Sequence, residues 1–218
     1  MMKVFYSKNL PDNHFFFNQE TQIEWVCQSL IEIHPLEFKF PQQTHKWIFF
    51  SSANGVKIFM TKEGADLSKY QIGCLGSATA EALPSSIHAN FIGTGSTEEI
   101  AEEFKFKVGL DTCLFIESQQ GINNIQTKFD PSQIQSIIAY QTIGKAITVP
   151  TCDCYFFTSP SNVKSYLKSN SIEDLKNVIA LGKTTQQVLS DLRIPSCIPN
   201  SYQHSDQFKA IIAQTHSL

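Results

Sequence analysis

The sequence predicts an α/β protein with parallel sheets, and three observations support that class. Short apolar runs rich in Phe, Ile and Val alternate with longer amphipathic stretches along the 218 residues. Several runs are apolar at consecutive positions, which is typical of strands that are covered on both faces. Two motifs also occur twice in the same order, which indicates two related lobes.

In chain order, the apolar runs predict strands at residues 3–7, 47–50, 71–75, 90–92, 112–116, 136–140, 154–158 and 178–181. The amphipathic stretches between them predict helices at residues 20–32, 54–61, 79–83, 97–106, 122–129, 162–169, 185–192 and 206–215. Start signals support two of these helices. Ser96 and Glu99 have the spacing of a capping box, and Ser159-Pro160 places a favoured cap before a favoured first helical residue.

The composition is that of a folded chain, with 42% hydrophobic and 17% charged residues. The net charge of −3 argues against nucleic-acid binding, which requires a basic surface. Arg193 is the only arginine among the 17 basic residues. A bound anion would therefore be held mainly by lysine, hydroxyl or backbone N–H groups.

The sequence also favours a cytoplasmic protein without a metal. No apolar stretch is long enough to span a membrane, and the first ten residues, MMKVFYSKNL, have no apolar signal core. In that compartment the six cysteines should be free thiols. The histidines and cysteines lack the spacing of metal ligands, so we expect no metal site.

The repeat consists of two motifs. Phe-Phe-[Ser/Thr]-Ser-x-x-x-Val-Lys begins at Phe49 and again at Phe156, and Leu-Gly-x-x-Thr begins at Leu75 and again at Leu181. The second copy ends near the C-terminus and lacks a strand equivalent to 112–116, so we expect the N-terminal strand to complete it. This predicts a discontinuous lobe of residues 1–35 and 146–218, a lobe of residues 42–138, and linker strands at 36–41 and 139–145.

The repeated motifs lie where strands end and helices begin, which is where open parallel sheets bind ligands. Free N–H groups and the helix dipole make such starts suitable for anions. We therefore expect four hydroxyl-rich helix starts to face one cleft, although serine and threonine in these positions usually act only as caps. The candidate substrate-binding residues are Ser51, Ser52, Ala53, Ser77, Ala78, Thr79, Ser159, Pro160, Ser161, Lys183, Thr184 and Thr185.

Together these motifs resemble the uroporphyrinogen-III synthase family. The resemblance rests on the repeated Phe-[Ser/Thr]-Ser motif, Leu-Gly-Ser-Ala-Thr-Ala at 75–80, Ala-Tyr-Gln-Thr at 139–142, Phe-Thr-Ser-Pro-Ser at 157–161 and Leu-Gly-Lys-Thr-Thr at 181–185. It implies two flavodoxin-like lobes joined by a two-stranded linker. The implied enzyme is a cofactor-free monomer that closes hydroxymethylbilane, a linear tetrapyrrole polycarboxylate, to uroporphyrinogen III, inverting the last pyrrole ring and losing water.

Tyr140 matches a tyrosine of that family, and the resemblance implies that it donates a hydrogen bond or proton to the departing hydroxyl. The chain departs from the family at two loops. It has Ser7-Lys8-Asn9 where many relatives have Thr-Arg-Pro, and Ile116-Glu117-Ser118 where relatives more often have a glycine-rich turn. The alternative interpretation is a non-catalytic two-lobed protein that binds a tetrapyrrole or a nucleotide.

Overall fold

The computed structural model describes residues 1–19, 23–121 and 125–215. Its contacts divide the chain into two compact units. The discontinuous unit comprises Met1–Glu32 and Ile143–Leu218, and the central unit comprises Ile33–Thr142. The cuts fall inside two strands, β3 (Ile31–Pro35) and β8 (Ile134–Gly144), which are neighbours in one sheet.

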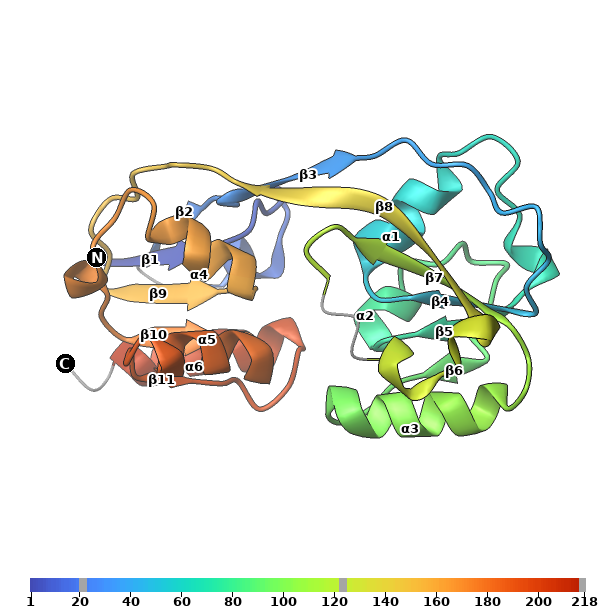
Figure 1. Ribbon diagram of the computed structural model, residues 1–218. Coiled ribbons are helices and arrows are strands. Elements are labelled where there is room, and N and C mark those ends of the chain that lie inside the picture. The colour runs from blue at the N-terminus through green and yellow to red at the C-terminus, as the bar shows by residue number, and fades with distance from the viewer. Residues whose placement is uncertain (20–22, 122–124, 216–218) are drawn as a thin grey trace. The chain divides into compact units, whose positions relative to one another are not determined.

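The discontinuous unit is built on a five-stranded sheet with the order β11-β10-β9-β1-β2 (Figure 1). All of its strand pairs are parallel. The strands are β1 (Met2–Tyr6), β2 (Ile23–Cys27), β9 (Cys154–Phe157), β10 (Val178–Ala180) and β11 (Ser196–Cys197).

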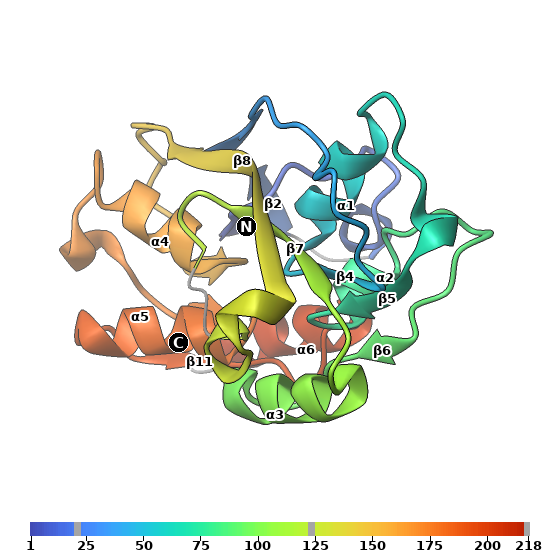
Figure 2. The same cartoon turned by 45° about the vertical axis from the view of Figure 1, so that its right-hand side comes forward.

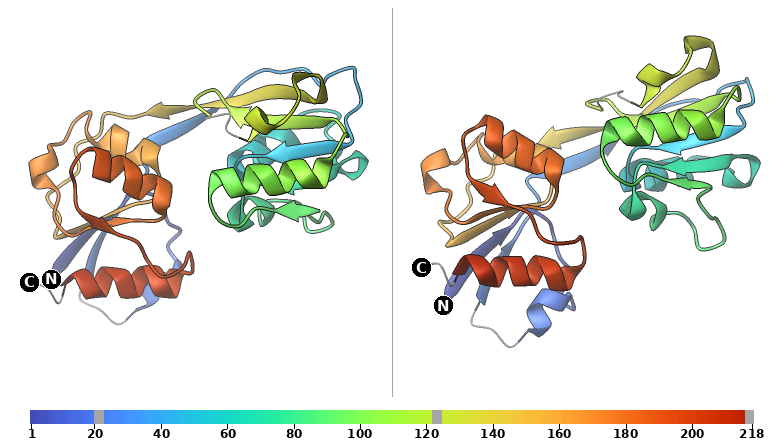
Figure 3. Two further views of the ribbon diagram at one scale, coloured as in Figure 1. Left: turned by 60° about the horizontal axis from the view of Figure 1, so that its bottom comes forward. Right: turned by 90° about the horizontal axis from the view of Figure 1, so that it is seen from below.

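Helices cover both faces of this sheet. Phe5 and Tyr155 belong to the core beneath α4 (Pro160–Tyr166) and α5 (Lys183–Asp191). Their neighbours Val4 and Phe156 belong to the core beneath α6 (His204–Thr215), which Figure 3 shows in red. Because successive side chains alternate between two buried faces, the strands are apolar at consecutive positions, as the sequence indicates.

The central unit has a six-stranded sheet with the order β3-β8-β7-β4-β5-β6. The pairs formed by β4 to β8 are parallel, and Figure 2 shows the long β8 beside β7. The strands not yet given are β4 (Trp47–Phe50), β5 (Gln71–Cys74), β6 (Phe91–Ile92) and β7 (Cys113–Ser118). The α/β class with parallel sheets is thus confirmed.

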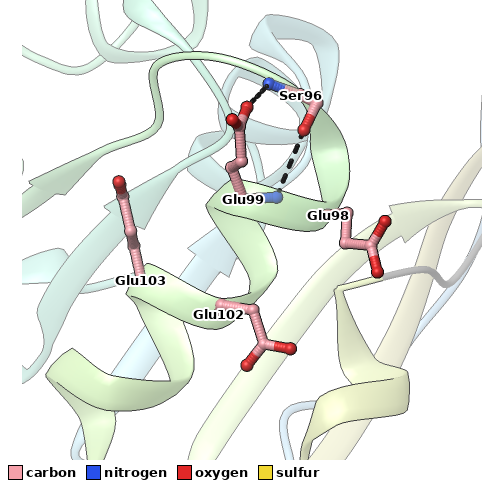
Figure 4. A pocket seen from close by; sticks show the side chains of 5 residues that line it. All are labelled: Ser96, Glu98, Glu99, Glu102 and Glu103. Carbon is pink, nitrogen blue, oxygen red and sulfur yellow. Dashed lines mark hydrogen bonds between the residues drawn. The ribbon is translucent and has the colours of Figure 1, made fainter.

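The central unit is layered like the other one. Phe50 lies in the core that includes residues of α1 (Ala53–Met60) and α2 (Ser77–Ala80). Phe49 points the other way, into the core beneath α3 (Thr97–Val108), shown in green in Figure 3. The start of α3 has the expected capping box. Ser96 Oγ accepts from Glu99 N at 3.3 Å, and Glu99 Oε2 accepts from Ser96 N at 2.7 Å (Figure 4).

The two sheets share one topology, but the strand beside the first repeated strand comes from a different part of the sequence in each unit. The path β4-α1-β5-α2-β6-α3 in the central unit corresponds to β9-α4-β10-α5-β11-α6 in the discontinuous unit. The next strand of the central unit, β7, lies beside β4, and the corresponding place beside β9 is taken by β1. The N-terminal strand therefore completes the sheet that the C-terminal segment begins.

Three expected elements differ in the structure. Within the helix predicted at 20–32, residues 20–22 lie outside the described residues, and the rest forms β2 and the first residues of β3. Within the helix predicted at 122–129, residues 122–124 lie outside the described residues, and only a 3-10 turn, Gln126–Lys128, follows. The linker strand expected at 36–41 lies earlier, at Ile31–Pro35.

Pairing explains the first correction. Trp25 and Val26 carry the aromatic and β-branched side chains that strands favour, and they pair in parallel with Val4 and Phe5 of β1. The backbone hydrogen bonds of this pairing outweigh the helical spacing of the apolar residues. Further short 3-10 turns lie at Phe15–Asn18, Leu67–Lys69, Pro131–Gln133 and Ile172–Asp174.

The described residues contain neither a membrane-spanning helix nor a cluster of metal ligands. None of the helices there combines the length and apolar character needed to cross a membrane. No group of three or more His, Cys, Asp or Glu side chains in that part of the chain is arranged to hold a metal ion. The six cysteines, all of which are described, form no disulfide.

Candidate functional site

The candidate residues lie at the carboxyl edges of the two sheets. In the central unit, α1 follows β4 and α2 follows β5, and these two strands are paired in parallel. In the discontinuous unit, α4 follows β9 and α5 follows β10, which are also paired in parallel. Parallel strands end at one edge of a sheet, so each unit presents two helix starts together.

The caps of α1 and α4 have nearly the same backbone conformation. Ser52 has φ −161° and ψ 158°, and Ser159 has φ −160° and ψ 157°. Each side chain caps its helix, because Ser52 Oγ accepts from Gly55 N at 3.1 Å and Ser159 Oγ accepts from Asn162 N at 3.3 Å. The repeated Ser-x-x-x-Val motif therefore encodes the same helix start in both units.

The two caps differ in their additional partner. Ser52 Oγ lies 2.6 Å from the hydroxyl oxygen of Tyr140, which belongs to β8. Ser159 instead accepts from the side-chain Nδ2 of Asn162 at 2.9 Å. Two residues that the sequence selects for separate reasons, Ser52 and Tyr140, thus form a hydrogen-bonded pair. Their neighbour Ser51 donates to the carbonyl of Ile116 at 3.3 Å.

The starts of α2 and α5 lack side-chain caps. Gly76 and Gly182 stand at the cap positions in extended conformations, with φ −167° and −158°, and neither start has a capping side-chain hydrogen bond. A glycine cap leaves the first-turn N–H groups of a helix open. Ser77 and Ala78 in α2, and Lys183 and Thr184 in α5, are all exposed. These two starts therefore present backbone donors to solvent.

The third residue of each start points inward. Thr79 and Thr185 are buried, with 6% and 2% of their surface exposed. The sequence predicts both among the substrate contacts. Their side chains instead pack under the helix starts, because position N3 faces the sheet while positions N1 and N2 face out. Helix α2 is also shorter than expected, with four residues, so its contribution rests on local N–H groups more than on a dipole.

The sole arginine lies away from this edge. Arg193 follows the C-terminal end of α5 in a left-handed conformation with φ 60°. Lys183 is the first residue of that nine-residue helix, which is about 13.5 Å long at about 1.5 Å per residue. The donors at the start of α5 are therefore Lys183 and backbone N–H groups.

Three polar residues that sequence reasoning did not select hold the edge of the discontinuous unit. Ser7 Oγ lies 3.1 Å from Thr158 Oγ1 and accepts from Thr158 N at 2.8 Å. Asn162 Oδ1 accepts from Leu30 N at 2.9 Å. Ser7 and Asn162 are almost wholly buried. For Ser7 and Thr158 the available signal was a polar residue directly after a buried strand, whereas Asn162 lies inside α4 and had no such signal.

Glu117, at the end of β7, is a buried carboxyl group. Only 5% of its surface is exposed, and its Oε2 has no hydrogen-bond partner among the described residues. Burial raises the pKa of Glu117, while hydrogen bonding from Gln126 and Ser136 partly opposes that rise. The ionised carboxylate is therefore disfavoured in the folded state.

We expect Glu117→Gln to stabilise the protein at neutral pH by about 1 kcal/mol. Below pH 4.5, the ordinary pKa of a glutamate, the carboxyl is protonated in both the folded and the unfolded protein, so its raised pKa costs no stability. As the pH rises from there through the pKa of the folded protein, ionisation favours the unfolded state and stability is lost. The gain should therefore be absent near pH 4 and grow toward pH 7. Urea unfolding at both pH values measures it, with the exposed Glu103→Gln as a control for net charge. A gain that is equal at both pH values would contradict the explanation.

An open hollow at the start of α3 is unsuited to anions. It is lined by Ser96, Glu98, Glu99, Glu102 and Glu103, four of which are carboxylates (Figure 4). The one cation placed there by an ion pair is Lys128, whose Nζ lies 2.7 Å from Glu102 Oε1, among the residues the structure describes. The glutamates form the solvated face that their spacing indicates.

The fold and the site together define a class of protein. It is an α/β protein with two parallel sheets of one repeated plan, whose hydroxyl-rich helix starts stand at the carboxyl edges. A sequence model described as "Uroporphyrinogen-III synthase HemD" matches residues 19–208. The chain belongs to the uroporphyrinogen-III synthase family.

Individual proteins agree with this assignment. The uroporphyrinogen-III synthase of Chlorobaculum parvum is 24% identical over 218 residues, covering 94% of this chain and 82% of the relative. The crystal structure of uroporphyrinogen-III synthetase from Helicobacter pylori 26695 has a TM-score of 0.68 at 16% identity and covers 98% of this chain and 99% of its own. A mutant uroporphyrinogen III synthase from Thermus thermophilus has a TM-score of 0.68 at 11% identity, with both chains fully covered. At these identities the two structures support the fold.

Proposed function

We propose that this chain is a uroporphyrinogen-III synthase, a lyase that closes hydroxymethylbilane with inversion of the terminal pyrrole ring and loss of water. The family match over residues 19–208 carries the proposal. The Chlorobaculum parvum relative points to the same activity. The alternative of a non-catalytic binding protein has no comparable support.

We further propose that the two units are the two lobes of this family and that helix starts in both bind the acid arms of the substrate. The exposed starts of α2 and α5 support this, because each offers first-turn N–H groups without a side-chain cap. The start of α4 adds Ser159 and Ser161 beside Pro160. Oriented N–H groups at helix starts suit carboxylates, and they take the part that arginines would play in a chain with more than one.

Charge places these contacts away from the reacting carbon. Loss of hydroxide leaves a cationic carbon, which the positive end of a helix would repel. The acid arms are therefore the groups by which the protein holds the substrate. Their binding folds the linear tetrapyrrole so that the substituted carbon of its last ring meets the cationic carbon. Positioning of this kind dominates when the unaided reaction already proceeds without inversion.

Tyr140 is the proposed source of the proton or hydrogen bond for the departing hydroxyl. We expect Tyr140→Phe to lower kcat about threefold to tenfold without abolishing turnover, since the hydroxyl leaves easily and an acid catalyst adds little. KM should change little. Steady-state kinetics measure both, and Tyr70→Phe, a half-buried tyrosine of the same unit, is the matched control. Full turnover in Tyr140→Phe would remove this residue from the mechanism.

Product analysis tests the proposed function. The protein is supplied with hydroxymethylbilane, the products are oxidised, and the ratio of type III to type I porphyrin is measured. Closure with inversion gives type III in excess over the unaided reaction. If the product is type I alone, and a thermal unfolding transition shows that the protein is folded, catalysis is rejected and the binding alternative remains.

A further inference from the structure

The hydroxyl of Ser52 makes two hydrogen bonds within the protein. It accepts from Gly55 N at 3.1 Å, and it lies 2.6 Å from the hydroxyl of Tyr140. A serine hydroxyl has two lone pairs and one proton. When Tyr140 donates, both lone pairs of Ser52 are used, and the proton of Ser52 must point away from the pair. Ser52 then offers a donor to whatever lies beyond it.

Burial distinguishes the two ends of the pair. Only 5% of Tyr140 is exposed, and its side chain packs in the core that includes Ile137 and Ala139. Ser52 is half-buried and stands at the start of α1. The end of the pair that a ligand reaches more easily is therefore Ser52.

A bulge fixes the direction of Tyr140. The register of β7 with β8 pairs Glu117 with Ile138 and then Ser118 with Tyr140, so Ala139 is an extra residue. In a regular strand Ala139 and Tyr140 would face opposite sides, but here both belong to the same core cluster. Bulges re-aim side chains in this way. The phenol is thus held toward Ser52 by strand pairing.

We propose that Ser52 is the hydroxyl that contacts the departing hydroxyl of the substrate and that Tyr140 acts through it. This inference rests on the proposed function and assigns the start of α1 to the leaving group, while the other helix starts hold acid arms. Tyr140 is then a positioning and proton-supplying residue behind Ser52.

The proton transfers balance. The C–O bond breaks with its electron pair on oxygen, and the oxygen leaves as water with the proton of Ser52. Ser52 takes the proton of Tyr140, which leaves a phenolate. Ring closure later releases a proton from the pyrrole carbon, and this proton returns through Ser52 to Tyr140. The full negative charge of the phenolate exceeds the half charge of the helix end, so the pair does not repel the cationic carbon.

The test compares Ser52→Ala, Tyr140→Phe, the double variant and Ser52→Thr in steady-state kinetics with hydroxymethylbilane. We expect Ser52→Ala to lower kcat about tenfold to a hundredfold with little change in KM. Tyr140→Phe should lower kcat less than Ser52→Ala does. The double variant should have the kcat of Ser52→Ala, because the two residues pass the same proton one after the other. Ser52→Thr keeps the hydroxyl and the cap, so it should retain most of the turnover.

Ser96→Ala controls for the lost helix cap. Ser96 caps α3 in the same unit and lies outside the proposed site, so this variant should lower Tm like Ser52→Ala while kcat stays unchanged. The inference is overturned if Tyr140→Phe loses as much as Ser52→Ala, if the two losses multiply in the double variant, or if Ser52→Ala is as active as Ser96→Ala. In each case a wild-type product rich in type III leaves the proposed function standing. A wild-type product of type I alone overturns both.

Discussion

Phe104→Ala is expected to destabilise the protein by about 3–5 kcal/mol. Phe104 has no exposed surface and lies on the buried face of α3, where it joins that helix to the sheet of the central unit. Its ring centroid lies between 4.6 and 6.3 Å from those of Phe49, Phe91, Trp47, Phe129 and Phe115. Removal of this ring loses contacts with all five and leaves a cavity that rigid strands cannot close.

Urea unfolding measures this loss, and the same helix provides the control. Phe106 lies two residues further along α3 and is 92% exposed. Phe106→Ala makes the same chemical change without opening a cavity and should cost less than about 0.5 kcal/mol. Similar midpoints for the two variants would contradict the assignment of Phe104 to the core.

The α/β class could be predicted because central strands such as β4 and β9 are buried on two faces. Trp47 and Phe49 face α3 while Ile48 and Phe50 face α1, so the whole run is apolar. Such a run cannot come from a sheet with one wet face. Helix starts were also predictable, since Ser52, Ser96 and Ser159 cap helices through short local contacts.

The segment after the first strand was not predictable from its pattern. Ile23, Val26 and Leu30 have the spacing of one face of a helix, yet residues 23–27 form β2. The deciding interaction is the pairing of β2 with β1, whose side chains the pattern of 20–32 does not include. In this short segment, pairing with a neighbouring strand therefore determines the structure, and the helical spacing of its apolar residues does not.

The Ser52–Tyr140 pair also lies beyond sequence reasoning. Its members are 88 residues apart, and their contact depends on the extra residue Ala139 in β8. A regular strand with the same sequence would turn the phenol to the other face. The sequence selected both residues but could not show that they touch.

Ser77→Pro is expected to weaken substrate binding, because it removes one backbone N–H from the start of α2. Ser77 is the first residue of the helix, where proline is favoured, and Gly76 before it is extended, as the residue before proline must be. The helix should therefore persist. Loss of a hydrogen bond to a carboxylate costs about 1.5–3 kcal/mol, which raises KM about tenfold to a hundredfold.

Ser77→Ala separates the amide from the hydroxyl, since it keeps the N–H and removes only the side-chain oxygen. If backbone donors hold the acid arms, Ser77→Ala should bind nearly as well as wild type, while Ser77→Pro binds poorly with an unchanged Tm. Equal weakening in both variants would assign the contact to the serine hydroxyl, and no weakening in either would place the arms elsewhere. The comparison therefore tests whether a chain with one arginine binds a polycarboxylate through its main chain, which is the physical basis of the proposed site.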